Sequence, residues 1–587
     1  MFQCLLIAAV AEVMDRTAWI AVTFCVIGLV LWEVYLAKQT PPRRAPVSVT
    51  PTQVSPVPTL SASPSVSPTA ASAGTAQKAL EPVPSFPEKI ETLRNSDVEL
   101  HLTNRGGGIK EVVLLKQVAE KGQRVILNCA ECAPIGAVLE QPASPELPEF
   151  TASPQSDSTV QFERTTTEQL TIRKKFFFLK SAETKDNFLI GMDVDVQNGG
   201  DKPYQSAPYF VALGSAAPIH PKDYPSYTRL VWCIGGKAKG IDVGWFGGGG
   251  GFLGMGQRAA RPFYQENIAG AEWVAVSNQF FTTLFKPLTA KADGVWGRRF
   301  DIERSPEQKL LGIEGALGMP GFQVPPGRTY MARFEIYAGP KIYHLLAQLP
   351  HNEAEIMDFG MFKIVCQFLL NFMNLLHSWL GNYAAAILAL TTIIKLVLWP
   401  IQNRANRSMR QMSALSPKMQ ELREKYKDDP TRMNQEVMKL YKSYGINPVG
   451  GCLPMVIQIP IFFGLFKMLG QAVELRNAKF LWVRDLSQPD TVAHLPLLGW
   501  PVNIIPLCMA ATQIWLMQMT PKTGDATQRR VMMFTPLIFL FICYNFAAAL
   551  ALYYTTQNLF SILQFYQNKN QPMPKLEKVA TAGKHKR

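Results

Sequence analysis

One lysine of this sequence stands inside an apolar segment, where its charge could do chemistry. Lys395 lies in the run from Tyr383 to Trp399, which is long and apolar enough to cross a bilayer. A cation in hydrocarbon is costly, so such residues usually face a protein interior or a hydrated cavity. There a low local dielectric would strengthen its attraction for acidic groups. Alternatively, because Lys395 precedes Trp399 by only about 6 Å at 1.5 Å per residue, its side chain could extend to the membrane interface.

The segments around Lys395 predict a membrane protein. The chain has 587 residues, 47% of them hydrophobic, so a single globular core is not expected. Apolar residues are concentrated at Thr17–Leu36 and again from Asn382 to the C-terminus. Their recurring stretches of roughly 20 residues predict a polytopic α-helical membrane protein.

The positions of the basic residues predict how these segments are oriented. The formal net charge is +14, and Lys and Arg crowd the loop after Lys395 and the C-terminal tail. The loop from Glu474 to Ala493 has few basic residues, and acids balance them. Because basic residues mark the cytoplasmic side, the first loop and the tail are predicted to be cytoplasmic and the 474–493 loop to lie outside. Six crossings then place the N- and C-termini in the cytoplasm.

The N-terminal part is predicted to be an anchor followed by a tether. Thr17–Leu36 is too long for a signal-peptide core and lacks a clear small-x-small cleavage site, so we expect an uncleaved transmembrane helix. Either Met1 or Met14 could be the start. Residues 38–88 are rich in Pro, Ser, Thr, Ala and Val, a composition that cannot bury a core and behaves as an extended tether.

Residues 89–345 are predicted to form one large β-sandwich-like domain outside the membrane. Apolar and polar residues alternate in runs such as Val98–Thr103, Leu170–Phe178 and Leu189–Val196, with Gly and Pro between them. Cys129 and Cys132 form one CxxC pair on the side where disulfides persist. A local disulfide is possible there, and a metal or redox site is not expected.

Helical patterns flank the segment that contains Lys395. Residues 346–381 have an apolar stripe that suits an amphipathic helix in the membrane interface. After the segment, apolar residues step by three and four along two stretches, which predicts an antiparallel helical hairpin. They are Met412, Leu415, Met419, Leu422 and Tyr426, then Met433, Val437, Leu440 and Tyr444. Asp429 and Pro430 are suited to begin the second helix, and Gly445 to end it.

These patterns together predict an order of segments along the chain. The order is an N-terminal segment with the first transmembrane helix (1–37), the tether (38–88), a periplasmic β-rich domain (89–345), an amphipathic interfacial helix (346–381), transmembrane helix 2 (382–403), a cytoplasmic helical hairpin (404–447), transmembrane helix 3 (448–472), a periplasmic loop (473–494), transmembrane helices 4 (495–519), 5 (531–545) and 6 (546–567), and a basic cytoplasmic tail (568–587).

Several motifs resemble those of the bacterial YidC membrane protein insertases, relatives of the mitochondrial and thylakoid insertases. The motifs are Gly445–Phe463, Val473–Ser487 and Leu550–Leu559, Ser408-Met409-Arg410 at the hairpin entrance, and, in the outer domain, Trp273–Phe281 and Tyr337–Lys341. The likeness is dense from Asn382 to Gln567 and looser in the outer domain. The Pro/Ser tether is not part of the family pattern.

This resemblance implies a function and a site. The family inserts and folds membrane proteins in the cell inner (cytoplasmic) membrane, alone or with the Sec translocon. Its five core helices enclose a hydrophilic groove with a basic residue at the position of Lys395. Thr391 lies one turn before Lys395 on the same face, and Gln458 and Tyr554 are further groove candidates. Ordinary interhelical hydrogen bonding would explain these last two equally well.

Lysine at position 395 departs from the family pattern, in which the groove cation is usually arginine. Arginine stays charged and offers a planar fork of donors, whereas lysine is a point charge that loses its proton more readily when it is desolvated. We predict that a hydrated groove keeps Lys395 charged.

The resemblance also implies partners. We expect nascent membrane proteins, the Sec translocon and membrane lipids, with ribosomes and targeting factors meeting the hairpin and the basic tail. No DNA, cofactor, metal or catalytic residue is expected, so the protein is not predicted to be an enzyme.

Two other classes of protein, solute transporters and membrane enzymes, fit the sequence less well than an insertase. A solute transporter would predict internal repeats and opposed broken helices with midplane charges, and no repeat relates the two halves of the sequence. A membrane enzyme would need a nucleophile–base pair or a set of metal ligands, and the seven histidines do not cluster.

Overall fold

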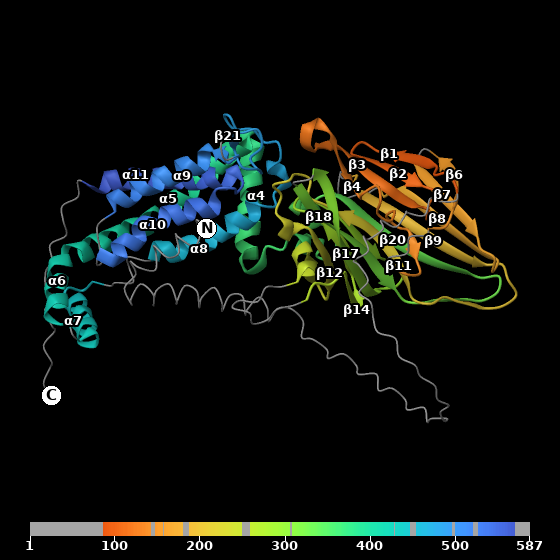
Figure 1. The fold of residues 1–587 in the computed structure, drawn as a ribbon, viewed down its shortest axis with the longest axis horizontal. Coiled ribbons are helices and arrows are strands. Elements are labelled where there is room, and N and C mark those ends of the chain that lie inside the picture. The colour runs from red at the N-terminus through yellow and green to blue at the C-terminus, as the bar shows by residue number, and fades with distance from the viewer. Residues whose placement is uncertain are drawn as a thin grey trace, which may run out of the picture. The chain divides into compact units, whose positions relative to one another are not determined.

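The structure is a computed structural model that describes residues 86–142, 147–156, 158–179, 187–248, 259–305, 308–427, 429–446, 453–495, 499–520 and 526–569 (Figure 1). The predicted anchor and nearly all of the tether and the basic tail lie outside the described residues. Two compact units are distinguished, Met1–Val83 with Gly524–Met532 and Pro84–Thr523 with Met533–Arg587. Every side-chain contact described below lies within the second unit.

The outer domain is built from three main sheets. The largest has the order β13 (Lys237–Asp242), β12 (Arg229–Ile234), β15 (Trp273–Ser277), β16 (Phe281–Pro287), β20 (Thr329–Pro340), β9 (Leu189–Asn198), β8 (Leu170–Phe178), β7 (Thr159–Thr165) and β6 (Thr151–Ser156). The second has the order β14 (Phe263–Ala271), β17 (Ala292–Ser305), β18 (Gln308–Met319), β11 (Tyr209–Ala216) and β5 (Val138–Leu139). The third has the order β1 (Ile90–Arg94), β2 (Val98–Thr103), β3 (Gly108–Val118) and β4 (Arg124–Leu127).

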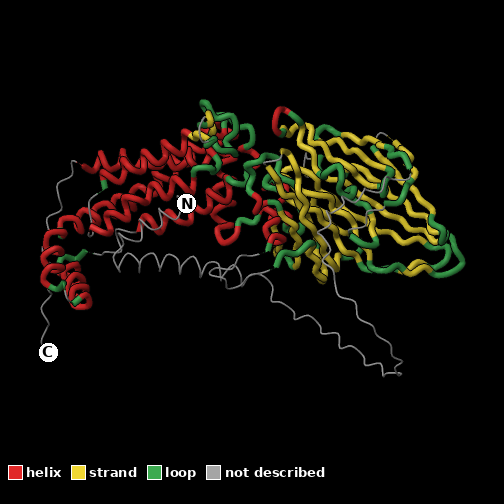
Figure 2. The backbone as a smooth tube through the Cα atoms, viewed as in Figure 1, coloured by secondary structure: helices red, strands yellow, loops and turns green. Residues whose placement is uncertain are grey.

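Alternation along the chain accounts for these strands. In β2 the residues Val98, Leu100 and Leu102 are buried while Glu99 and His101 are only partly so, as expected when successive side chains point to opposite faces. Strands β11 and β18 of the second sheet pack against β12, β15 and β16 of the largest one, and together they enclose the core. The predicted β-rich domain is therefore confirmed, and Figure 2 shows its strands separated from the helices.

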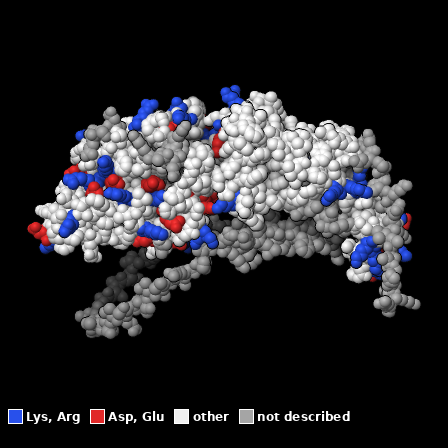
Figure 3. All heavy atoms as spheres, turned by 180° about the vertical axis from the view of Figure 1, so that it is seen from behind, with Lys and Arg blue, Asp and Glu red and all other residues white. Residues whose placement is uncertain are grey.

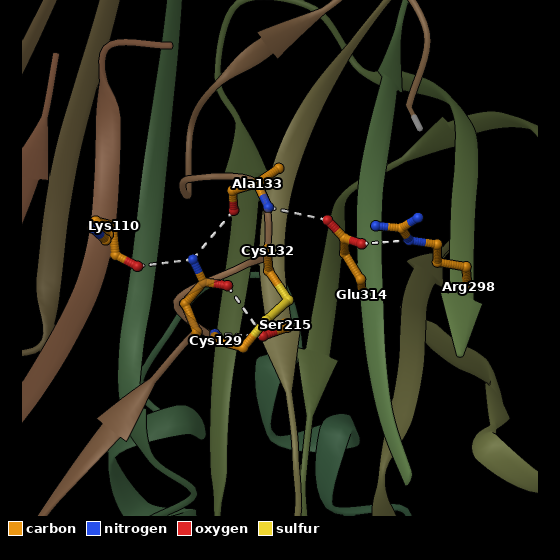
Figure 4. The surroundings of a disulfide bond; sticks show 8 residues. Lys110, Cys129, Cys132, Ala133, Ser215, Arg298 and Glu314 are labelled. Carbon is orange, nitrogen blue, oxygen red and sulfur yellow. Dashed lines mark hydrogen bonds and ion pairs between the residues drawn. A yellow bond between two sulfur atoms is a disulfide. The ribbon is translucent and has the colours of Figure 1, made fainter. Parts of the chain in front are cut away.

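The possible disulfide between Cys129 and Cys132 is present, in the turn after β4. Backbone and side-chain bonds hold this turn from several directions. The Cys129 amide donates to Ser215 Oγ at 2.8 Å, and the Ala133 amide donates to Glu314 Oε1 at 3.2 Å. Figure 4 shows that these partners come from neighbouring strands, so the disulfide closes a turn that is already anchored.

After Pro340 the described residues are mostly helical and include one small pair of strands, and a second small pair belongs to the outer domain. The helices are α3 (Tyr343–Leu346), α4 (Lys363–Leu380), α5 (Tyr383–Ala414), α6 (Ser416–Lys425), α7 (Pro430–Ser443), α8 (Leu453–Leu469), α9 (Ile504–Met519), α10 (Ala526–Cys543) and α11 (Ala548–Lys569), and the small strand pairs are β10 (Tyr204–Gln205) with β19 (Gln323–Val324) and β21 (Thr491–His494) with β22 (Pro501–Asn503).

Helix α5 is longer than the predicted second span. It continues through Pro400 to Ala414, so the segment predicted as the first arm of the hairpin begins as the end of α5. Within the described residues, α5 is the one helix both long and apolar enough to cross a membrane, and Ile457–Leu469, Ile504–Met519 and Met533–Cys543 are shorter apolar helical stretches. The count of six spans therefore stays a prediction.

Some of the heptad residues of the predicted hairpin pack together, and others do not. Leu415, Tyr441 and Ile446 are buried in one small cluster, and Met412, Met419, Val437, Leu440 and Tyr444 pack around it. Asp429 begins α7 as predicted, since its carboxylate accepts from the Arg432 amide at 3.0 Å and Pro430 follows it. Leu422, Tyr426 and Met433 are not members of this cluster.

Helix α4 has apolar residues on more than one face. Leu369, Leu370 and Met373 are buried as α4 packs on α5 and α8, whereas Ile364 and Phe368 are exposed. Leu369 and Phe368 both belong to the apolar stripe predicted for this helix, and the structure divides them, with Leu369 on the packed face and Phe368 on the outer one.

The helical part carries a broad uncharged surface. Exposed apolar side chains include Val397 on α5 and Phe534, Ile538 and Phe541 on α10. In the face shown in Figure 3, charged atoms of both signs cover the outer domain and Lys and Arg atoms gather near α6 and α7, with mostly uncharged atoms between. Such a distribution suits helices surrounded by lipid.

Both motifs of the outer domain contact the segment that follows α8. The side chain of Gln279 donates to the Gly470 carbonyl at 2.7 Å, and Lys341 Nζ lies 3.4 Å from Gln471 Oε1. Arg476 donates to the Val118 carbonyl at 3.0 Å and lies over the rings of Phe280 and Phe281. We call this set of contacts the junction.

Candidate functional site

Lys395 points into an interface between helices. It lies on α5, only 8% of its surface is exposed, and its Nζ donates to Ser561 Oγ on α11 at 2.7 Å. This geometry argues against a side chain that extends to the membrane interface. Among the described residues no carboxylate forms an ion pair with Lys395, so its hydrogen-bond partner is a neutral hydroxyl.

Thr391 lies one turn before Lys395 and is also buried, with 1% of its surface exposed. Its hydroxyl donates to the Ile387 carbonyl in its own helix at 2.7 Å. The Thr391 hydroxyl therefore places a polar group on this face of α5, but it already donates its hydrogen bond within the helix.

The two further groove candidates, Gln458 and Tyr554, make different kinds of contact. Gln458 Nε2 on α8 donates to the hydroxyl of Tyr553 at 3.0 Å and to Gln557 Oε1 at 3.1 Å. Tyr554 instead packs its ring against Phe462 and Phe539, with centroid separations of 5.3 and 4.9 Å. The tyrosine that bonds Gln458 is thus its neighbour, Tyr553.

A chain of hydrogen bonds connects Gln458 with Lys395. Gln557, which accepts from Gln458, lies one turn before Ser561 on α11. The Ser561 hydroxyl donates to the Gln557 carbonyl at 3.0 Å and accepts from Lys395. Side chains from α5, α8 and α11 therefore converge, and of the four predicted residues Lys395 and Gln458 make hydrogen bonds in this network.

Polar contacts continue along α5 and α11 beyond Lys395. Gln564 Nε2 donates to Asn403 Oδ1 at 2.7 Å and to the Trp399 carbonyl at 3.3 Å. Asn568 donates to the same Asn403 oxygen at 3.0 Å, and Arg410 donates to the Asn568 carbonyl. We call Lys395, Asn403, Arg410, Ser561, Gln564 and Asn568 the polar seam.

The sequence contained a signal for the α11 half of this seam that was not used. Gln557, Ser561, Gln564 and Asn568 step by four, three and four, so they form one polar face of a helix. In a helix predicted to cross a bilayer, such a face indicates a protein partner or a hydrated surface.

A buried amide near the polar seam has no hydrogen-bond partner in the described part of the chain. Asn406 on α5 has 3% of its surface exposed, and neither its amide oxygen nor its amide nitrogen has a hydrogen-bond partner among the described residues. Because leaving buried polar atoms unpaired is costly, this position favours water or a polar group of another molecule.

The fold and this site together define a class: an integral membrane protein with a large β-rich outer domain and a cationic, polar interface among its helices. Residues 91–372 match the family model described as the YidC periplasmic domain, and residues 375–575 match that of the 60Kd inner membrane protein. The chain belongs to the YidC membrane protein insertase family.

Individual relatives cover different amounts of the chain. Membrane protein insertase YidC of Syntrophus aciditrophicus is 42% identical over 260 residues, which are 44% of this chain and 46% of that protein. The insertase of Citrifermentans bemidjiense is 30% identical over 490 residues, 80% of this chain and 83% of that protein. The chain thus spans less than half of the first relative and most of the second.

Among solved structures, the active YidC insertase crystal structure with its first transmembrane domain resolved aligns with a TM-score of 0.33 and 20% identity, covering 84% of this chain and 96% of that one. The family models and the named relatives do not support the alternative of a solute transporter.

Proposed function

We propose that this chain inserts and folds integral membrane proteins in the inner membrane, using the face around Lys395 to receive polar parts of its clients. The observation that supports this most directly is a buried cation whose partner is a neutral hydroxyl. A charge without a neutralising partner in a helical interface is expensive, so it is expected to serve a function.

In the proposed step, an acidic residue of the client is attracted to Lys395, and the attraction strengthens as water between the two groups is lost. An acidic residue in the translocated tail of a client would exchange its hydration for contact with Lys395. A pair of unit charges 4 Å apart is worth about 4 kcal/mol at an effective dielectric of about 20, against about 1 kcal/mol in bulk water. The apolar helix of the client would meanwhile move into lipid beside the uncharged surface of α5 and α10.

Water around the polar seam would keep this step reversible. Asn406, Asn403 and Gln564 offer amide groups along the same pair of helices, and Asn406 has unpaired atoms among the described residues. Hydration there would shorten the hydrocarbon path for a polar tail and would keep Lys395 charged. The transfer is physical, and no covalent chemistry is assigned to any residue.

The finer architecture and the partners belong to the same proposal. Six spans with both termini in the cytoplasm would place the hairpin and the basic tail where ribosomes and targeting factors arrive. The Sec translocon and anionic lipids are the remaining proposed partners, the latter because basic segments bind anionic membrane surfaces.

Replacement of Lys395 tests the proposal in a strain depleted of its own insertase. We expect Lys395→Ala to reduce the insertion of clients with acidic translocated tails by at least about tenfold, equivalent to about 1.4 kcal/mol. Lys395→Arg should retain insertion, since arginine keeps the charge. Lys237→Ala, at an exposed position on β13, is the matched control. Normal insertion of all clients by Lys395→Ala would overturn the proposed role of the cation.

A further inference from the structure

We propose that Ser561 on α11 is a positioning residue that sets which clients Lys395 receives. Its hydroxyl holds the ammonium group in the helical interface without neutralising it, so that an acidic group of a client can take the place of the hydroxyl. This inference rests on the proposed function and deepens it, because it assigns the preference for acidic translocated tails to a second residue. One of its tests needs no client.

The hydroxyl of Ser561 is free only to accept. Ser561 lies in the interface with 8% of its surface exposed, and its own proton goes to the Gln557 carbonyl at 3.0 Å. A serine hydroxyl has one proton and two lone pairs, so it still accepts after it has donated. Lys395 Nζ donates to it at 2.7 Å. Since Ser561 is the one hydrogen-bond partner of this ammonium among the described residues, two of its three protons remain for another acceptor.

A row of acceptors along α11 fixes the place of this hydroxyl. Tyr553, Gln557 and Ser561 follow one another at intervals of four residues, so they lie on one side of the helix. Gln458 on α8 donates to the Tyr553 hydroxyl at 3.0 Å and to Gln557 Oε1 at 3.1 Å. Lys395 on α5 donates to the next member of the row. Bonds from two neighbouring helices therefore hold α11 in one rotation and register.

The helices around Lys395 supply no acid that could neutralise it. The sequences of α4, α5, α8, α9, α10 and α11 contain neither Asp nor Glu. The partner that α11 does supply, Ser561, is neutral. The positive charge of Lys395 is therefore held in place by these helices but not compensated by them.

The difference between a hydroxyl and a carboxylate gives the site its preference. A client that offers a hydroxyl or an amide would replace one bond between a cation and a neutral acceptor with another bond of the same kind. A client carboxylate would replace it with a bond between opposite charges, which is stronger in a low dielectric. Because specificity is a difference between such affinities, a neutral group at position 561 lets acidic groups displace it while neutral groups gain little.

Two substitutions of Ser561 separate the effect of charge from that of size. In a strain depleted of its own insertase, Ser561→Asp should reduce insertion of a client with an acidic translocated tail by at least about tenfold, because the new carboxylate would pair with Lys395. Ser561→Asn has nearly the same shape but keeps a neutral acceptor, so it should retain insertion. A client whose tail acids are replaced by asparagine should insert equally well with both variants.

Loss of the hydroxyl tests the positioning itself. Without an acceptor the ammonium is no longer ordered in advance, so Ser561→Ala should lower insertion of the acidic tail by at least about threefold. Ser561→Thr keeps the hydroxyl and should restore insertion. Thr556→Ala is the matched control, since Thr556 on the same helix also donates to a carbonyl four residues earlier, that of Leu552 at 2.8 Å.

Thermal unfolding of the purified full chain in detergent detects the contact without a client. Ser561→Asp should keep the unfolding midpoint of the wild type, because Lys395 pairs with the new carboxylate. In a Lys395→Ala background the same substitution should lower the midpoint by at least about 2 °C, since the buried carboxylate then has no cation. An equal change of the midpoint in both backgrounds would overturn the inference.

The insertion results separate this inference from the proposed function. Equal losses in Ser561→Asp and Ser561→Asn, or equal losses of acidic and neutral tails in Ser561→Asp, would overturn the inference, because size would then be the cause. Normal insertion of the acidic tail by Ser561→Ala would overturn it as well. Normal insertion by Lys395→Ala would overturn the proposed function itself. Impaired insertion by Lys395→Ala together with normal insertion by Ser561→Asp would overturn this inference alone.

Discussion

Buried lysines in this chain have different surroundings, and the surroundings decide what each can do. Lys174 on β8 donates to the carbonyls of Gly106, Gly107 and Gly136 at 2.8, 3.2 and 3.0 Å, so all three of its protons are used. Among the residues that the structure describes, Lys395 has one hydrogen-bond partner, the neutral hydroxyl of Ser561. The first lysine is therefore a structural cross-link between segments of the outer domain, whereas the second keeps capacity for another molecule.

Lys174 predicts a pH dependence of stability. Burial lowers its pKa from the usual 10.5 to about 7. Between about pH 7 and 10.5 the unfolded chain binds more protons than the folded one, so stability rises with pH by up to about 1.4 kcal/mol per unit for this group. We expect Lys174→Met to reduce this rise in denaturant titrations of the full chain followed by tryptophan fluorescence.

A neighbouring lysine gives the control for that measurement. Lys175 lies on the opposite face of the same strand, and Lys175→Met should keep the rise. Some rise should remain in Lys174→Met as well, because burial also lowers the pKa of Lys341 to about 7. Identical slopes in the wild type and Lys174→Met would contradict the assignment.

At the scale of elements, the polar face of α11 fixes that helix against α5. Gln564 provides two of the bonds and is buried, with 1% of its surface exposed. Gln564→Leu would leave Asn403 with fewer donors, so we expect a loss of about 1–2 kcal/mol in stability. Thermal unfolding in detergent should show a lower midpoint.

The same helix supplies a matched control. Gln567 is exposed on α11, so Gln567→Leu removes the same chemical group without breaking a bond of the polar seam. An equal drop in the unfolding midpoint for both variants would mean that the hydrogen bonds of the polar seam do not specifically stabilise the protein.

At the scale of the whole molecule, the junction connects the outer domain with the helices. Arg476 joins them by its bond to Val118 and its position over Phe280 and Phe281. Burial also lowers the pKa of its guanidinium. Removing the contacts of Arg476 should loosen the coupling between the outer domain and the helices without unfolding either of them.

Amide hydrogen exchange measures that coupling. We expect Arg476→Met to increase exchange at least severalfold in the segments around Val118 and Gly470, while the strands of the outer domain stay protected. Arg484→Met, at an exposed position in the same loop, is the control. Unchanged exchange in Arg476→Met would show that the remaining junction contacts suffice.

The sequence by itself determined which faces of the elements are apolar. Alternation located β2 and β8 to the residue, and the capping signals placed the start of α7 at Pro430. Patterns with periods of 2 and 3.6 residues are local, so they can be recognised without knowing the fold. Lys395 stood out for the same reason, as a local exception to an apolar run.

Only the tertiary structure decided which of these faces meet. Tyr553 and Tyr554 are adjacent in sequence, but they point about 100° apart around a helix, and just the first reaches Gln458. Likewise, Ser561 lies 166 positions from Lys395 and still accepts its hydrogen bond. Such pairings depend on the packing of the whole chain. The free energy of that packing is distributed over many long-range contacts, so no single segment of the sequence predicts them.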